Sequence, residues 1–223
     1  MTRIDREAAP ATAIAALPSV VALLAGRRGL AAGLAVLPAA IAAFFRDPDR
    51  TPDHRPAPID DVLSPADGKV MYVGPGQDLV APEGEWQQIS IFLSAFDVHV
   101  NRLPIDGTIG AIRYHPGKFL NAALDKASED NERNAVRIDT AEGSSVVVVQ
   151  IAGLIARRIK CWIGEGQTMR AGARFGLIRF GSRVDVYLPE GTEPLVVLGQ
   201  KVIAGETVLA RIGEARLIEG VVQ

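Results

Sequence analysis

Some of the residues in this chain could carry out acyl transfer, beginning with a serine that directly follows a glycine. Ser182 follows Gly181 in the stretch RFGSRV, and this pair interrupts two runs that alternate like β-strands. Glycine suits a sharp bend or the close approach of another group, so the pair fits an ordinary hairpin corner. It also fits a serine that attacks the preceding carbonyl, because glycine leaves that carbonyl sterically open. The Gly181–Ser182 bond is therefore a candidate reaction site.

A histidine and an aspartate that could serve this serine occur earlier in the chain. His99 lies in DVHVNR, where strand alternation puts His99 and Asn101 on one polar face. That face is either solvent-exposed or one wall of a site. Asp67 lies in SPADGKV at a turn before a strand, where an Asp-Gly pair is also ordinary turn chemistry. If the fold gathers Asp67, His99 and Ser182, they could form an acyl-transfer constellation.

A serine hydrolase acting on an external substrate is the alternative enzyme hypothesis. Common hydrolases carry the serine in a Gly-x-Ser-x-Gly elbow, whereas here Phe180 and Val184 occupy the two glycine positions. Such a hydrolase would remain an uncut chain that reacts with a fluorophosphonate.

The composition argues against several other classes. A net charge of −2 with mixed signs gives no electrostatic case for nucleic acid as a partner. The single cysteine, Cys161, excludes an internal disulfide and a cysteine-based zinc cluster. No pair of histidines has metal-ligand spacing, so we expect no metal site.

Residues 1–45 form an apolar amino-terminal segment that we expect to be helical and membrane-associated. After the first ten residues its only charged side chains are Arg27 and Arg28, and each apolar half is just under the roughly 20 residues of a comfortable membrane span. A hairpin with the Arg pair at its tip and helices embedded in one leaflet both fit. Residues 46–62 are predicted to be a linker to a catalytic domain over residues 63–223. We expect attachment to the inner membrane, with the main domain in the cytoplasm.

Short β-type runs recur along the rest of the chain, separated by Gly, Pro, Asp or Asn. They lie at residues 69–73, 88–93, 108–114, 135–139, 145–152, 157–163, 175–180, 183–188, 195–198 and 207–212. Such spacing predicts a mainly β fold, a sandwich- or barrel-like sheet assembly. Residues 118–134 break the rhythm and are predicted to be a polar loop with a short helix, a usual place for ligand contacts. His115, which ends a strand before a Pro-Gly turn, either caps that turn or faces a ligand.

Two segments of the chain are similar to each other. GQTMRAGARFGLI (166–178) and GQKVIAGETVLAR (199–211) share Gly-Gln, then Ala-Gly at the same offset, then a β-run. They are predicted to form paired hairpins similar to those of lipoyl and biotinyl carrier domains, with Lys201 only nominally placed as the modified lysine. A non-enzymatic lipoyl-like binding module is therefore a third hypothesis, which would give an uncut and unreactive chain.

Five stretches together resemble the short prokaryotic phosphatidylserine decarboxylase proenzymes. They occur in order from about Phe44 to Pro194 and read FFRDPDR, LSPADGKV, FLSAFDVHVNRLPIDG, YHPGKFLNAALDKASEDNERN and GARFGLIRFGSRVDVYLP. In that family the serine hydroxyl attacks the glycine carbonyl, the ester is eliminated, and hydrolysis leaves a pyruvoyl group. The resemblance implies a cut between Gly181 and Ser182, giving a β chain of residues 1–181 and an α chain of residues 182–223.

The resemblance also implies a cofactor and residue roles. The covalent pyruvoyl group derived from Ser182 would form a Schiff base with phosphatidylserine and act as the electron sink for decarboxylation to phosphatidylethanolamine. His99 would be the base and Asp67 the acid that orients it. Long members have a second histidine where this chain has Arg102, and Leu-Gly-Ser-Thr at the cut. Whether His99 serves self-cleavage, decarboxylation or both therefore stays open.

The implied partners are the membrane lipid and the two chains of the cut protein, which would remain together as a heterodimer. A higher oligomer is compatible with this arrangement. A lipid phosphate requires hydrogen-bond donors, preferably cationic, and His115, Lys118 and Arg102 are the predicted substrate-binding residues.

Overall fold

The computed structural model describes residues 2–4, 8–50, 60–78, 80–117, 131–153, 158–179 and 182–213. The chain divides into two compact units. The first consists of Met1–Asp49 with Phe96–Val98, and the second of Arg50–Ala95 with His99–Gln223.

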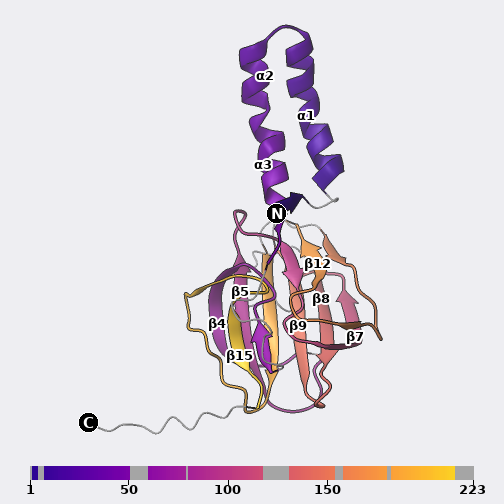
Figure 1. Cartoon of the computed structure of the whole chain (residues 1–223), viewed down its shortest axis with the longest axis vertical. Coiled ribbons are helices and arrows are strands. Elements are labelled where there is room, and N and C mark those ends of the chain that lie inside the picture. The colour runs from indigo at the N-terminus through magenta and orange to yellow at the C-terminus, as the bar shows by residue number, and fades with distance from the viewer. Residues whose placement is uncertain are drawn as a thin grey trace, which may run out of the picture. The chain divides into compact units, whose positions relative to one another are not determined.

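The first unit is a helical hairpin closed by a short sheet (Figure 1). Helix α1 (Ala8–Leu24) packs against α2 (Arg28–Leu34) and α3 (Val36–Phe44), while β1 (Thr2–Ile4) pairs antiparallel with β2 (Arg46–Pro48). The turn after α1 contains Gly26 at a φ of 75° and Arg27, so the Arg pair lies at the tip of the hairpin, as one of the two predicted geometries requires. Within the described residues, no helix is both long enough and apolar enough to span a membrane.

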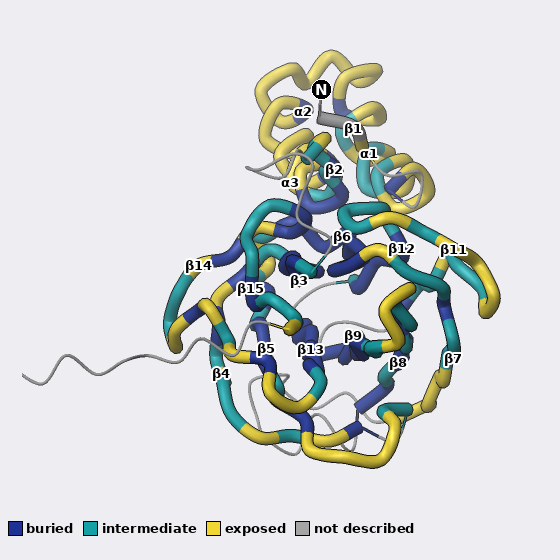
Figure 2. The backbone as a smooth tube through the Cα atoms, turned by 60° about the horizontal axis from the view of Figure 1, so that its bottom comes forward, coloured by how far each residue is buried: buried dark blue, intermediate teal, exposed yellow. Residues whose placement is uncertain are grey.

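The second unit is built on one eight-stranded sheet that curls around a core (Figure 2). Its strand order is β11-β7-β8-β9-β13-β5-β4-β14, and all neighbours are antiparallel. The long strands are β4 (Gly68–Gly76), β5 (Trp86–Leu93), β7 (Gly107–His115), β8 (Arg133–Asp139), β9 (Ser145–Ala152) and β13 (Ser182–Pro189). The edges are the two-residue strands β11 (Thr168–Met169) and β14 (Lys201–Val202).

Two smaller sheets complete the unit. One has the order β10-β12-β6, formed by Ile159–Cys161, Arg174–Ile178 and Val100–Arg102. The other pairs β15 (Val208–Arg211) with β3 (Asp61–Leu63). Apolar side chains from all three sheets form one core, which includes Ile91, Val148, Phe175, Val186 and Leu209. The predicted mainly β class is confirmed, and the large sheet is curled like half of a barrel.

The similarity between residues 166–178 and 199–211 is visible in the backbone. Gly166 and Gly199 have φ of 83° and 87°, and Gly172 and Gly205 have φ of 77° and 71°. Each copy supplies a two-residue strand to one edge of the large sheet and a longer strand to a small sheet. The predicted paired hairpins are therefore wrong, because the two strands of a copy pair with other strands and not with each other. These left-handed positions favour glycine because other residues pay a steric penalty there.

One predicted strand does not form, and one predicted loop is described only at its end. The run at residues 195–198 is not a strand, so that prediction is wrong: only Pro194 forms a bridge, to Ala210, and the chain then turns so that Gln200 N–H bonds to the Val197 carbonyl. Of the predicted loop at residues 118–134, residues 118–130 lie outside the described part of the chain, while Arg133 and Asn134 begin β8.

Candidate functional site

The sheet brings six strand ends to one end of the second unit. β13 begins at Ser182, which pairs with Leu93 at the end of β5 and with Ala152 at the end of β9. Lys69, near the start of β4, pairs with Phe92, and on the other side Arg133 at the start of β8 pairs with His115 at the end of β7. Residues far apart in the sequence therefore meet around Ser182.

Ser182 lies fully buried in this row of strand ends. Strand alternation points its side chain to the same face as Val184, Val186 and Leu188, which belong to the main core. Its Oγ has no hydrogen-bond partner among the described residues. A buried hydroxyl without a partner is costly, so it marks a place where function is to be expected. Gly181 lies outside the described residues.

His99 is also fully buried, and it directly precedes β6. Its backbone carbonyl accepts the N–H of Ile178 at 3.2 Å. Ile178 ends β12, and the connection from it leads directly to Ser182. Four residues of chain span at most about 14 Å, so His99 is tied to the neighbourhood of Ser182.

Asp67 lies just before β4 in the same row of strand ends, with its side chain 14% exposed. Its Oδ2 accepts a hydrogen bond from Arg50 Nη2 at 2.7 Å, and its Oδ1 accepts the backbone N–H of Ala204 at 2.8 Å. The following Gly68 is required by packing, because a Cβ there would lie 2.2 Å from the carbonyl oxygen of Phe92. Asp67 is thus held at a fixed position next to β5.

The three predicted substrate-binding residues differ in their surroundings. Arg102 is buried, and its Nη1 donates to the Gly172 carbonyl at 2.9 Å. His115 is exposed at the end of β7. Lys118 lies outside the described residues. Their assignment to the lipid phosphate remains a prediction.

A series of hydrogen-bonded, buried amide side chains lies next to Ser182, and most of it is not evident from the sequence alone. Asn134 Nδ2 donates to Gln150 Oε1 at 3.0 Å, and Gln150 Nε2 donates to Asn101 Oδ1 at 2.8 Å. All three side chains are buried. The available signal was Gln150 at the end of the otherwise apolar run SVVVVQ, since a polar residue there requires buried partners.

Asn131 and Glu132 form hydrogen bonds with Ala152 at the end of β9, the residue that pairs with Ser182. Asn131 Nδ2 donates to the Ala152 carbonyl at 2.7 Å, and the Ala152 N–H bonds to the Glu132 carbonyl at 2.9 Å. The Glu132 carboxylate accepts the Tyr114 hydroxyl at 3.0 Å. Burial and this hydrogen bond raise the pKa of Tyr114. Both residues belong to the segment 118–134, for which the sequence predicts a polar loop with a short helix.

The opposite face of β13 carries a buried ion pair. Arg183 Nε donates to Asp185 Oδ1 at 2.6 Å, and Arg183 Nη2 donates to Ser90 Oγ at 2.9 Å. Gln88 Nε2 donates to Asp185 Oδ2 at 3.1 Å. Burial raises the pKa of the Asp185 carboxyl, and Arg183 opposes that shift. These contacts fix the strand directly after Ser182.

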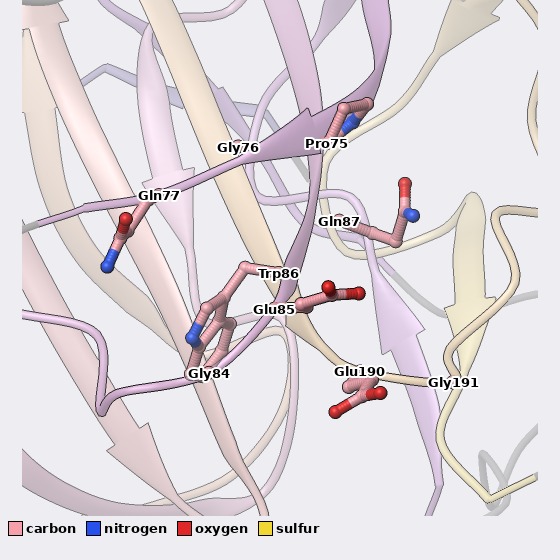
Figure 3. A pocket seen from close by; sticks show the side chains of 9 residues that line it. All are labelled: Pro75, Gly76, Gln77, Gly84, Glu85, Trp86, Gln87, Glu190 and Gly191. Carbon is pink, nitrogen blue, oxygen red and sulfur yellow. The ribbon is translucent and has the colours of Figure 1, made fainter.

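A cavity of about 610 Å³ lies at the other end of these strands (Figure 3). It is lined by residues around the start of β5 and the end of β13, including Trp86, Glu85 and Glu190. The length of β13 puts it about 23 Å from Ser182, at roughly 3.3 Å per residue. It is therefore separate from the row of strand ends.

No group of three or more His, Cys, Asp or Glu side chains that could hold a metal ion occurs in the part of the chain that the structure describes.

The fold and the site together define a mainly β protein with a buried serine and a buried histidine at one end of its core.

Comparison with known proteins gives the family. The family model described as phosphatidylserine decarboxylase matches residues 37–210. The phosphatidylserine decarboxylase proenzyme of Paramagnetospirillum magneticum is 59% identical over 170 residues, which cover 75% of this chain and 70% of the relative. Those of Novosphingobium aromaticivorans and Burkholderia cenocepacia are 52% and 49% identical and cover 94% of this chain, and 87% and 96% of their own lengths.

The chain belongs to the phosphatidylserine decarboxylase family. The family expected from the sequence is confirmed, and so is the expected enzyme class, a decarboxylase made as a proenzyme.

Proposed function

We propose that this protein decarboxylates phosphatidylserine to phosphatidylethanolamine by means of a pyruvoyl group that it makes from Ser182. The names of the relatives support the reaction and the proenzyme state. The single observation that carries the assignment to Ser182 is its buried Oγ without a partner at the start of the central strand β13. A buried hydroxyl without a partner is what we expect of a serine that the proposed self-cleavage converts into a pyruvoyl group.

The residues around Ser182 fit the conversion. Attack by the hydroxyl requires a base, and His99 is the buried histidine tied to the connection that leads to Ser182. The carboxylate of Asp67 would orient that base and stabilise its charged form. When present, a pyruvoyl group supplies an electron-withdrawing carbonyl for the loss of carbon dioxide from an amino acid head group.

The sheet topology supports a heterodimer of β chain 1–181 and α chain 182–223. β13 lies between β5 and β9, so its backbone is paired on both sides with strands of the other chain. β14 pairs with β4, and β15 pairs with β3. A cut before Ser182 would leave all four of these pairings in place.

Substitution of Ser182 by alanine tests the proposal. The wild-type protein should give two chains by intact mass, with the smaller one beginning at a blocked residue 182, whereas Ser182→Ala should remain uncut and inactive. Two normal chains from the alanine variant, or an active wild-type protein with an unmodified serine, would rule the proposal out.

We also propose that the helical hairpin attaches the protein to the inner membrane, with the β-rich unit on the cytoplasmic side. Exposed apolar side chains along its helices support this, among them Leu17, Val21 and Leu24 at 60%, 64% and 84% exposure. Replacing these three residues by serine should reduce co-flotation with phospholipid vesicles. Serine at the 69% exposed Leu198 of the other unit is the control and should leave flotation unchanged. Equal flotation of all variants would contradict the attachment.

A further inference from the structure

We propose that Arg183 and Asp185 are positioning residues, which fix the register of β13 on β5 after self-cleavage and so keep residue 182 at its strand end. This inference rests on the proposed function, because it concerns the state in which residue 182 has become the first residue of the α chain. It gives a role to the ion pair that is buried beside the reactive serine.

The apolar face of β13 does not specify a single register on β5. Val184 lies opposite Ile91 of β5. Val186 lies opposite Ile89, and all four side chains belong to the core. A shift by two residues keeps each inward side chain inward, because side chains alternate with a period of two, and it again places aliphatic groups opposite each other. Such a shift would move Ser182 by about 7 Å along the sheet.

The outer face of β13 carries contacts that exist in one register only. Asp185 is the register partner of Ser90 on β5. Arg183 Nε donates to Asp185 Oδ1 at 2.6 Å, and Arg183 Nη2 donates to Ser90 Oγ at 2.9 Å. Gln88 Nε2 donates to Asp185 Oδ2 at 3.1 Å and to Ser90 Oγ at 2.9 Å. A shift by two residues would place Asp185 opposite Phe92 or Gln88 and disrupt these contacts.

The strand on the other side of β13 offers this pair no polar partner in its row. Arg183 lies opposite Ile151 of β9, and Asp185 lies opposite Val149. Both of these β9 side chains are buried in an apolar cluster. The ion pair is almost completely buried as well, so water cannot replace contacts that a shifted strand would lose. The shifted register is therefore penalised by buried charges with poorer hydrogen bonding.

The proposed cut changes what holds the beginning of β13. In the uncut chain, residues 179–181 connect β13 to β12, which is itself paired with β10 and β6. After the cut, β13 begins at a chain end, and chain ends fray unless other contacts hold them. Ser90 and Gln88 would belong to the β chain, and Arg183 and Asp185 to the α chain. The hydrogen bonds on the outer face would then join the two chains next to the new end.

A fixed register matters for the reaction because residue 182 would carry the reactive carbonyl. Ser182 lies between Leu93 and Ala152, in the row of strand ends. Displacement of a reacting group by even about 1 Å can greatly slow a reaction, and a two-residue shift is larger than that. If only a fraction of the molecules has the correct register, that fraction sets kcat. The KM of the competent molecules is unchanged.

The test compares Arg183→Met/Asp185→Leu in two full-length backgrounds, one with Ser182 and one with Ser182→Ala. The double variant replaces the polar contacts with apolar groups of similar size. Amide hydrogen exchange of residues 183–187, measured by mass spectrometry, should be about 10-fold or more faster than in the parent once the chain is cut. In the uncut Ser182→Ala background, exchange should stay within about threefold of its parent, because the chain connection remains.

Enzyme kinetics on phosphatidylserine vesicles give an independent measurement. Self-cleavage of newly synthesised Arg183→Met/Asp185→Leu should proceed within about threefold of the wild-type rate, because it precedes the loss of the connection. The kcat of the cut variant should fall by about 10-fold or more, with KM within about threefold of wild type.

Two further variants separate a fixed register from general stability. Arg137→Met/Asp139→Leu makes the same exchange in an ion pair on β8, within the β chain, and should leave exchange at residues 183–187 and kcat unchanged. Ser90→Ala removes only the acceptor of Arg183 and Gln88. It should accelerate exchange in the cut protein by about threefold or more, so the inference remains testable if the double variant does not fold.

The outcomes distinguish this inference from the proposed function. Equal acceleration of exchange in the cut and uncut double variants would overturn it, because that result indicates a general structural role. Wild-type exchange and kcat in the cut double variant, or wild-type exchange in cut Ser90→Ala, would also overturn it. A wild-type chain that is never cut before residue 182 would refute the proposed function, and this inference with it.

Discussion

Loss of one partner of the buried Arg183–Asp185 pair is predicted to be among the most destabilising changes in the second unit. Asp185 is fully buried, and the Arg183 side chain is 6% exposed, so neither charge can be rehydrated in the folded state. Asp185→Asn would leave the guanidinium uncompensated, which costs about 3–5 kcal/mol in comparable buried pairs. In a chain of this size each kcal/mol corresponds to roughly 2–4 °C, so the melting temperature should fall by about 10 °C.

The proper assay is a double-mutant cycle in a Ser182→Ala background, which is expected to stay uncut so that a single chain unfolds. Arg183→Met with Asp185→Leu removes both charges and replaces them with apolar groups of similar size. Because the desolvation cost disappears with the charges, the double variant should lose less stability than Asp185→Leu alone, which leaves the Arg183 charge without a partner. If Asp185→Asn lowers the free energy of unfolding by less than about 1 kcal/mol, the pair is not strongly coupled. If the losses in Arg183→Met and Asp185→Leu simply add in the double variant, the two charges do not depend on each other. Either result would contradict this prediction.

Two further predictions concern packing and pH. Gly68→Ala should lower the free energy of unfolding by about 1–3 kcal/mol or more, because the new Cβ would collide with the Phe92 carbonyl oxygen. The control is Gly84→Ala, since Gly84 has a similar φ of 143° and open space around it. Equal melting temperatures for the two variants would contradict the steric explanation. The backbone N–H of Ile112 donates to Glu165 and lowers the pKa of this carboxyl. The ionised Glu165 therefore stabilises the folded state at pH values above its pKa in the unfolded chain. This stability is lost as the pH falls through the lower pKa of the folded state. Glu165→Gln should therefore lower the melting temperature at pH 7 by more than at pH 3, and a constant difference would be inconsistent with this linkage.

The sequence predicted the long strands well because their residues follow simple rules. The run at residues 183–188 is bounded by Gly-Ser and Pro, and it forms most of β13. The repeated Gly-Gln and Ala-Gly offsets predicted two similar segments, and the four left-handed glycines are the physical reason for the repeat, although the paired hairpins expected there do not form. In both cases the decisive constraint is local, so a single sequence contains it.

The failed or missing predictions concern contacts that are not local. Residues 195–198 have strand-like composition, but Pro194 and the turn at Val197–Gln200 limit them to one bridge. Gln150 looked like the polar end of an apolar strand, and only the folded sheet shows that it joins Asn134 to Asn101. The residues that face each other across two strands are set by the strand register and the sheet topology. A single sequence does not specify either of these.

The distribution of polarity along the core explains why the site lies where it does. Most of the inner face of the large sheet is apolar, but at the end around Ser182 the polar side chains of Ser182, Gln150, Asn134 and Asn101 are buried together. Two of their polar atoms have no partner among the described residues, and each such atom costs about 1–3 kcal/mol in the uncut chain. The apolar remainder of the core offsets that cost, and the proposed self-cleavage would use the Ser182 hydroxyl. Buried polar groups without partners are confined to one end of a core that is otherwise well packed. A chain with this distribution can react with itself at that end and remain folded afterwards.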